Sequence, residues 1–262
     1  MKTISIINLK GGVGKTTTAV TMAQLLAHQG KKGNIRKRVL LFDNDKQGNT
    51  SRLFNLYNGQ TEAPACQVLK TGDITGAIRH TKFKCIDVIP CNYFMELAEL
   101  QLKADTENPQ HARYRKALEA VKDKYDYCII DNPPDLGLNV INALVATDEI
   151  IIPVNLDCYA LDGLEELVDQ VNKIKILNQK ATLAGCLITN FEKADTSEAA
   201  EIWLRTKSGF PVYAQKIRHS KKVSDSTFYK QTPLDYSIRC GASQDYKKFV
   251  NEYIAKAAER EV

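Results

Sequence analysis

The sequence predicts a three-layer α/β domain in which helices cover both faces of a mostly parallel central sheet. Short apolar runs, of the kind that form buried parallel strands, alternate along the chain with segments of helical periodicity. No internal repeat, low-complexity segment or linker interrupts this alternation, which gives six or seven strands. We therefore expect a single domain over residues 1–262, a length near the upper limit for one domain.

The first elements can be placed in order. A strand at residues 4–7 precedes a helix at about 16–29, and a strand at 39–42 follows. Between them, five of the eight residues 31–38 are basic, which favours a solvated turn and leaves a binding site as the alternative. A further strand is predicted at 85–90.

The remaining elements are helices at 94–103 and 111–124, strands at 127–131 and 149–154, a helix after 160, strands at 183–189 and 212–217, and a terminal helix. In the helix at 111–124, Tyr114, Leu118 and Val121 recur at helical spacing, which indicates core rather than site. The terminal helix carries an apolar face from Tyr246 to Ala257. We expect it to dock on the sheet; a membrane-surface helix is the alternative, but the helix lacks a basic face.

The glycine-rich segment Leu-Lys-Gly-Gly-Val-Gly-Lys-Thr-Thr at 9–17 separates the first strand from the first helix. This order forms a phosphate cradle, because glycines let backbone N–H groups close on an anion at a positive helix N-terminus. Lys15 would reach the β- and γ-phosphates and the Thr16 hydroxyl would bind Mg²⁺. The alternative is a glycine-rich turn with incidental lysines. The expected nucleotide contacts are Gly11, Gly12, Val13, Gly14, Lys15, Thr16 and Thr17.

Carboxylates follow two of the predicted strands. Asp43 and Asp45 lie at the carboxyl end of strand 39–42, the edge where open α/β sheets bind ligands. Asp131 closes strand 127–131 in the Walker B arrangement, in which the carboxylate holds Mg²⁺. The turn that follows contains Pro133, Pro134 and Gly137 and is typical of a switch loop. For these aspartates the alternative role is to cap the next helix or turn.

Composition excludes several other classes of protein. Seven scattered cysteines form no Cys-x-x-Cys pair, so neither a zinc site nor a disulfide framework is expected. The N-terminus has no signal-peptide layout, and the longest strongly apolar stretch, residues 150–154, is too short to span a membrane. These features predict a cytoplasmic protein. The formal net charge of +5 is modest and does not by itself indicate an anionic partner.

A second lysine distinguishes the glycine-rich segment from an ordinary P-loop. Lys10 precedes two adjacent glycines, and Leu9 stands where the ordinary pattern has glycine. The segment resembles the deviant Walker A motif of the ParA/MinD ATPases. Residues 43–49 are similar to that family's Asp-x-Asp-Pro-Gln-Gly-Asn element, with Lys46 in place of proline. Collinear matches at 131–134, 160–163, 217–223 and 244–246 place the resemblance closest to the ParA/Soj branch without an N-terminal helix-turn-helix domain.

The resemblance implies a P-loop NTPase fold with ATP and Mg²⁺ as cofactors. It also implies an ATP-sandwich homodimer in which Lys10 crosses to the nucleotide of the other subunit. In this family Asp45 would position or activate the attacking water, and Asp43 would support Mg²⁺ and its waters. In some relatives an asparagine placed like Asn190 reads the adenine base.

The same resemblance implies sequence-independent DNA binding by the ATP dimer. Between Arg205 and Lys230 the chain has seven basic residues against one acid, Asp225. Such a cluster gives salt-sensitive affinity for phosphates, although by itself it indicates a solvated face. The candidate contacts are Arg218, Lys221 and Lys222, with Lys216 a weaker one. The chain departs from the family at Asp195-Thr196, where relatives often carry Arg-Thr.

The function expected from this resemblance is plasmid or chromosome partitioning by a nucleoid-associated ATPase. Lys10, Lys15 and Asp45 would be its catalytic residues, and a ParB-type centromere-binding protein would stimulate its slow hydrolysis of ATP. A MinD-like positioning ATPase, which needs a membrane-targeting terminal helix, is the first alternative. The nitrogenase iron protein and amide-forming ligases, which share the P-loop, form a third class; the iron protein requires two cluster-binding cysteines in each subunit.

Overall fold

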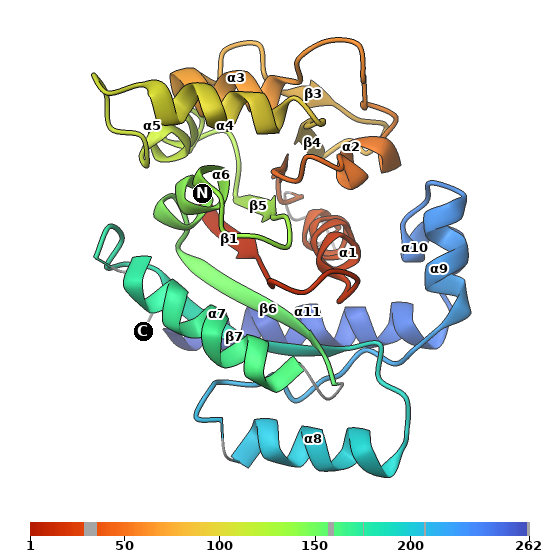
Figure 1. Cartoon of the computed structure of the whole chain (residues 1–262). Helices are drawn as coiled ribbons and strands as arrows, with labels where there is room; N and C mark the ends of the chain where they lie inside the picture. The colour runs from red at the N-terminus through yellow and green to blue at the C-terminus, as the bar shows by residue number, and fades with distance from the viewer. Residues whose placement is uncertain (29–35, 157–159, 175, 207, 261–262) are drawn as a thin grey trace.

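The computed structural model describes residues 1–28, 36–156, 160–174, 176–206 and 208–260. Its sheet has seven strands in the order β3-β4-β2-β5-β1-β6-β7 (Figure 1). All neighbouring strands are parallel except β3 and β4, which confirms the predicted mostly parallel sheet. The strands are β1 (Lys2–Ile6), β2 (Val39–Asp43), β3 (Arg79–His80), β4 (Ile86–Ile89), β5 (Tyr127–Asp131), β6 (Glu149–Asn155) and β7 (Thr182–Thr189).

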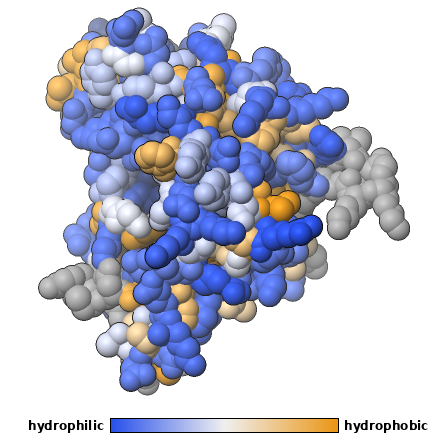
Figure 2. All heavy atoms as spheres, turned by 90° about the vertical axis from the view of Figure 1, so that its right-hand side faces the viewer, coloured by the Kyte–Doolittle hydropathy of each residue, from blue (hydrophilic) through white to orange (hydrophobic). Residues whose placement is uncertain are grey.

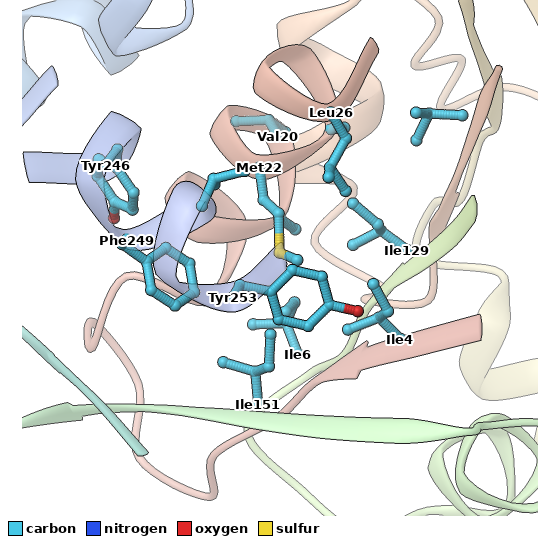
Figure 3. Packing of buried hydrophobic residues seen from close by; sticks show 14 of the residues in the cluster. Ile4, Ile6, Val20, Met22, Leu26, Ile129, Ile151, Tyr246, Phe249 and Tyr253 are labelled. Carbon is cyan, nitrogen blue, oxygen red and sulfur yellow. The ribbon is translucent and has the colours of Figure 1, made fainter. Parts of the chain in front are cut away.

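Helices cover both faces of the sheet, as the alternation of strands and helices predicts (Figure 1). Successive strand residues point to opposite faces, so each strand supplies both cores. On one face Ile129 and Ile151 pack with residues of α1 and α11 (Figure 3). On the other face Ile130 packs with α3 to α6, and Ile150 packs with α6 to α8. The helices are α1 (Lys15–Ala27), α2 (Asn49–Leu53), α3 (Pro64–Thr71), α4 (Met95–Ala104), α5 (Arg113–Glu119), α6 (Leu138–Val145), α7 (Ala160–Ile174), α8 (Asp195–Thr206), α9 (Lys221–Phe228), α10 (Pro233–Ser237) and α11 (Gly241–Arg260).

The central strands end together at one edge of the sheet. Asp131 is the Cα partner of Ile6 on one side and of Asp43 on the other. The loops that leave β1, β2 and β5 therefore start at the same level. In parallel α/β sheets this carboxyl edge is where ligands bind. The register alone thus brings the glycine-rich loop and two aspartates together.

The predicted strand at 212–217 is wrong. The segment makes only isolated bridges, Cys186 to Val212 and Phe191 to Arg218. Between these bridges the backbone N–H groups of Ala214 and Gln215 donate to the Glu252 carboxylate of α11, at 2.7 and 2.9 Å. Because Tyr213 donates to Cys186 and alternate N–H groups of a strand point the same way, a continuous ladder with β7 would need the Gln215 donor, which Glu252 takes.

Other differences from the prediction are smaller. The helix expected at 111–124 ends at Glu119 in α5, and residues 120–124 form turns. The two-residue strand β3 and the helices α2, α3, α6, α8, α9 and α10 were not predicted. Tyr114, Leu118 and Val121 are buried, which confirms their assignment to the core. In the basic loop predicted at 31–38, residues 31–35 lie outside the described residues.

Candidate functional site

The glycine-rich loop connects β1 to α1 as predicted and leaves space for an anion. Gly12 and Gly14 have φ of +74° and +83°, in the left-handed region where a side chain would be strained. Cβ atoms built at Gly11 and Gly12 would meet nothing within 4 Å. The start of α1 carries no acidic side chain in its first turn. The loop and the helix N-terminus together form an anion cradle of the expected kind.

The loop lysine lies inside this cradle. Lys15 is 7% exposed, and its Nζ donates to the carbonyl oxygen of Lys10 at 2.8 Å. Burial lowers the pKa of Lys15, and the nearby carboxylates of Asp131 and Asp45 oppose that shift. Lys10 and Lys15 flank the segment from Gly11 to Gly14, so this one hydrogen bond spans the loop. Exchange of that bond for a phosphate oxygen would cost little.

Asp131 and Asp43 lie side by side at the sheet edge, both fully enclosed. Asp131 Oδ2 accepts a hydrogen bond from the Thr50 hydroxyl at 2.8 Å. Its other oxygen, Oδ1, is buried and has no hydrogen-bond partner among the described residues. Burial raises the pKa of both carboxyls, and the neighbouring Asp131 charge raises that of Asp43 further. An unpaired buried carboxylate oxygen beside a second carboxylate is suited to a divalent cation.

Asp43 also performs the capping role that was considered for it. Its Oδ2 accepts from the Ser51 backbone N–H at 2.8 Å and from the Ser51 hydroxyl at 2.5 Å. It thereby fixes α2 against the end of β2. Asp45, which is 7% exposed, accepts instead from the Gln47 N–H at 2.9 Å, ahead of α2. Burial raises the pKa of Asp45, and the charges of Lys15 and Lys46 partly offset the effect.

Lys15, Thr16 and Asp45 line the same hollow, with a volume of about 580 Å³. Gly11, Gly12 and Pro134 border it on the side of the sheet edge, and α9 and α10 face them across the opening. The structure therefore brings the cradle, its lysine and the candidate water-activating aspartate around one space. Among the described residues no three His, Cys, Asp or Glu side chains form a metal cage. Mg²⁺ in triphosphate sites takes most of its ligands from phosphates and water, so the donor set present fits it.

A buried amide network that sequence reasoning missed holds the two aspartate loops. The Tyr114 hydroxyl donates to Asn44 Oδ1 at 2.8 Å, and Asn44 Nδ2 donates to Asn132 Oδ1 at 2.9 Å. Asn139, in α6, donates to the Asn44 carbonyl at 2.9 Å. Asn44 sits between the aspartates of one loop, and Asn132 follows Asp131 in the other. The sequence signal for this network was an asparagine directly after the last aspartate of both β2 and β5.

Asn190 borders a second hollow, of about 370 Å³, beside the glycine-rich loop. Gly12, Gly14 and Thr17 also line it, so it is continuous with the cradle. The Thr189 hydroxyl donates to the Val13 carbonyl at 2.8 Å and ties the end of β7 to the loop. Asn190 itself has φ of +52°. The structure thus places Asn190 within the same site.

The candidate DNA contacts differ in how they are held. Arg218 makes a bidentate ion pair with Asp245, at 2.7 and 2.8 Å, and Asp245 is buried. Lys216 pairs with Glu201 at 2.5 Å and lies over the ring of Phe191. Lys221 and Lys222 are exposed at the start of α9, and Lys222 makes one hydrogen bond to Ser237. The face that carries α9 and α10 is mainly hydrophilic, with small hydrophobic patches between (Figure 2).

The terminal helix α11 uses its apolar face inside the core. Tyr246, Phe249 and Tyr253 are at most 2% exposed and pack with α1 and the central strands (Figure 3). The Tyr253 hydroxyl donates to Glu149 at 2.7 Å, and Arg260 donates to the same carboxylate. The helix is docked on the sheet as predicted. No described helix is long and apolar enough to cross a bilayer.

Comparisons with known proteins agree with this geometry. A family model described as an AAA domain matches residues 1–183. The sporulation initiation inhibitor protein Soj of Bacillus subtilis is 36% identical over 97% of this chain and 98% of that protein. The chromosome partitioning protein ParA of Caulobacter vibrioides is 31% identical over 100% of this chain and 97% of that protein. A solved structure of a putative plasmid partition protein from Borrelia burgdorferi, bound to AMPPNP, has a TM-score of 0.78 at 25% identity and covers 99% of both chains.

Proposed function

This chain belongs to the ParA/Soj family of partition ATPases, and on that premise we propose that it hydrolyses ATP with Mg²⁺ to segregate plasmid or chromosomal DNA. In this proposal an ATP-bound homodimer binds DNA without sequence preference. Hydrolysis, stimulated by a ParB-type partner bound to its own DNA site, releases the dimer. The protein would accordingly act in the cytoplasm, on the nucleoid.

One observation carries the nucleotide part of the proposal. Lys15, Thr16 and Asp45 surround one hollow, and the buried oxygen of Asp131 behind it has no partner among the described residues. Thr16 and Asp131 would hold Mg²⁺, with Asp43 supporting its water shell. When bound, the ion would neutralise charge that develops on the phosphates.

The protein's own groups would perform the remaining tasks. The N–H groups of residues 11–17 would bind the phosphates, and Lys15 would move from the Lys10 carbonyl to a phosphate oxygen. Asp45 would orient the attacking water, since its carboxylate lines the hollow beside Lys15. Lys10 would supply a cation to the nucleotide of the partner subunit. Because that cation has a binding site only when a γ-phosphate is present, dimerisation would follow the nucleotide state.

Exposed cations beside the nucleotide site support the DNA part of the proposal. Lys221 and Lys222 begin α9, whose later residues Ser226 to Phe228 line the nucleotide hollow. A nucleotide-dependent change at the hollow would therefore reach these lysines directly. Arg218 is a less direct contact, since its guanidinium already pairs with Asp245. Phosphate contacts of this kind give affinity without sequence preference.

The MinD-like alternative requires a terminal helix that is available to a membrane. The apolar residues of α11 are instead packed in the core, and Glu149 holds its end through Tyr253 and Arg260. Release of the helix would expose that core and leave the buried Glu149 carboxylate without these donors. This cost favours the DNA-binding function. We expect no pelleting of the protein with liposomes of anionic lipid in Mg-ATP.

Light scattering coupled to size-exclusion chromatography tests the proposed cycle. With Asp45→Ala to slow hydrolysis, the protein should elute as a dimer in Mg-ATP and as a monomer in Mg-ADP. Lys10→Ala in the same background should remain monomeric while still binding ATP. A dimer that forms equally in both nucleotides, or that survives Lys10→Ala, would contradict the proposal.

A further inference from the structure

His219 lies against Asn190 at the second hollow, the one of about 370 Å³ beside the glycine-rich loop. Ring Nδ1 of His219 is 2.6 Å from Oδ1 of Asn190, so in this arrangement the imidazole donates and the amide oxygen accepts. Ring Nε2 lies 3.5 Å from the Glu192 carboxylate. Among the described residues the other end of the Asn190 amide, Nδ2, makes no hydrogen bond. The amide is therefore oriented by one neighbour and has a free donor.

The backbone around this pair is fixed, so the contact is built into the fold. The Phe191 N–H donates to the Ile217 carbonyl, and the His219 N–H donates to the Phe191 carbonyl, both at 2.9 Å. These two bonds form the bridge between the end of β7 and the segment before α9. Asn190 and His219 are held on either side of it.

The hollow suits a nucleobase better than it suits phosphates. It shares Gly12, Gly14 and Thr17 with the cradle, but Lys15 and Thr16 do not line it, and the Arg218 guanidinium at its wall is already paired with Asp245. Ile217 and Val223 supply apolar surface for the faces of a ring. The lysine, the threonine hydroxyl and Asp45 line the other hollow, where the γ-phosphate and the water belong. A nucleotide laid across the loop would thus place its base beside Asn190.

We propose that His219 is a specificity-determining residue, which sets the orientation of the Asn190 amide and thereby the group that Asn190 presents to ring nitrogen N1 of a purine. The proposal rests on the nucleotide binding proposed above. A donor at position 219 holds Oδ1 on its own side and leaves Nδ2 for the base. An acceptor at 219 would turn the amide over and leave Oδ1 for the base.

The chemistry of purines makes this orientation measurable. Ring nitrogen N1 of adenine is a hydrogen-bond acceptor, whereas N1 of hypoxanthine carries a hydrogen and donates, and ATP and ITP have the same triphosphate. An amide that presents its NH2 group to N1, as the contact with His219 arranges here, favours ATP, and one that presents oxygen favours ITP. The ratio of the two affinities reports the orientation, because the charge of a side chain at 219 acts equally on both triphosphates.

The test measures the dissociation constants of Mg-ATP and Mg-ITP by titration calorimetry for four proteins, all in the Asp45→Ala background. In His219→Lys position 219 only donates, and in His219→Glu it only accepts, while the parent protein and Lys221→Glu serve as references. We expect the preference for ATP over ITP to be at least about fivefold greater in His219→Lys than in His219→Glu. Lys221→Glu, a charge change two residues away, should leave the ratio at the parent value.

A second pair of variants shows whether the effect passes through the amide. In Asn190→Ala, the same Lys and Glu substitutions at 219 should give equal ratios, since no amide remains to be turned. A ratio that is the same in His219→Lys and His219→Glu, or that still differs without Asn190, would overturn the proposal while ATP binding persisted. Absence of binding of both nucleotides to the parent protein would overturn the proposed function as well.

Discussion

Asp131 stands directly opposite Asp43 in the register of β5 and β2, so two buried carboxylates adjoin at the edge of the sheet. Thr50 and Ser51 donate to one oxygen of each, and Asp131 Oδ1 remains without a partner among the described residues. Burial of adjacent like charges is unfavourable for folding unless a cation or protons compensate them. Such a site lowers stability when it is empty, as expected if it holds Mg²⁺ in the proposed function.

Asp131→Asn should separate these two effects. Removal of one buried charge is expected to raise the melting temperature without Mg²⁺, since Thr50 can still donate to the amide oxygen. The same change should lower kcat for ATP about 100-fold, because the ion loses a charged ligand. Calorimetry in EDTA and a phosphate-release assay check both halves. A variant that is less stable in EDTA, or fully active, would contradict the account.

The raised pKa of Asp43 predicts how stability changes with pH. A carboxyl whose pKa is higher in the folded than in the unfolded protein binds more protons when folded, so stability falls as pH rises above the unfolded value of about 3.9. The decrease continues until the pH passes the raised value in the folded state. In EDTA, melting temperatures between pH 5 and 8 should fall more steeply for the parent than for Asp43→Asn. Parallel profiles for the two proteins would exclude this linkage.

The loop after β2 offers a contrast between neighbouring residues. Asp45→Ala should slow hydrolysis about 100-fold or more with little change in ATP affinity, as expected for loss of a water-orienting base. Lys46 replaces the family's proline and pairs with Glu96 at 2.6 Å, but both side chains are substantially exposed. Lys46→Ala should therefore alter kcat only a few-fold. Equal losses in the two variants would mean that Asp45 acts on loop structure rather than on the water.

The candidate DNA contacts can be tested without disturbing the fold. Lys221→Ala combined with Lys222→Ala removes exposed cations, so DNA affinity should fall. The slope of log K for DNA against log salt concentration should become shallower by about 0.9 for each phosphate that is no longer neutralised. Arg218→Ala leaves the buried Asp245 carboxylate without its partner, and we expect it to lower the melting temperature as well. A double lysine variant with unchanged salt dependence would remove both residues from the interface.

The sequence predicted those parts of the site whose chemistry is local. Gly12 and Gly14 take positive φ between a strand and a helix, and Asp43 and Asp131 end adjacent strands, as their motifs indicate. Contacts between distant residues could not be read in this way. Asp245 pairs with Arg218 across 27 residues, and His219 meets Asn190 across 29.

The one wrong strand has the same physical origin. Residues 212–217 have a strand-like pattern, and backbone bonds to Cys186 and Ile188 do form at the two ends of the segment. Glu252, from a helix far along the chain, accepts the backbone donors in the middle. The local pattern predicts an extended segment, and such a segment forms. Its contact with the Glu252 side chain prevents a continuous strand.

The most direct test of the central claim is fluorescence anisotropy of a labelled random-sequence duplex titrated with the Asp45→Ala protein. Titrations in Mg-ATP, in Mg-ADP and without nucleotide, each at several salt concentrations, separate nucleotide dependence from simple charge attraction. The account predicts tight, salt-sensitive binding in Mg-ATP and weak binding in the other two states. Equal anisotropy in all three states would contradict it.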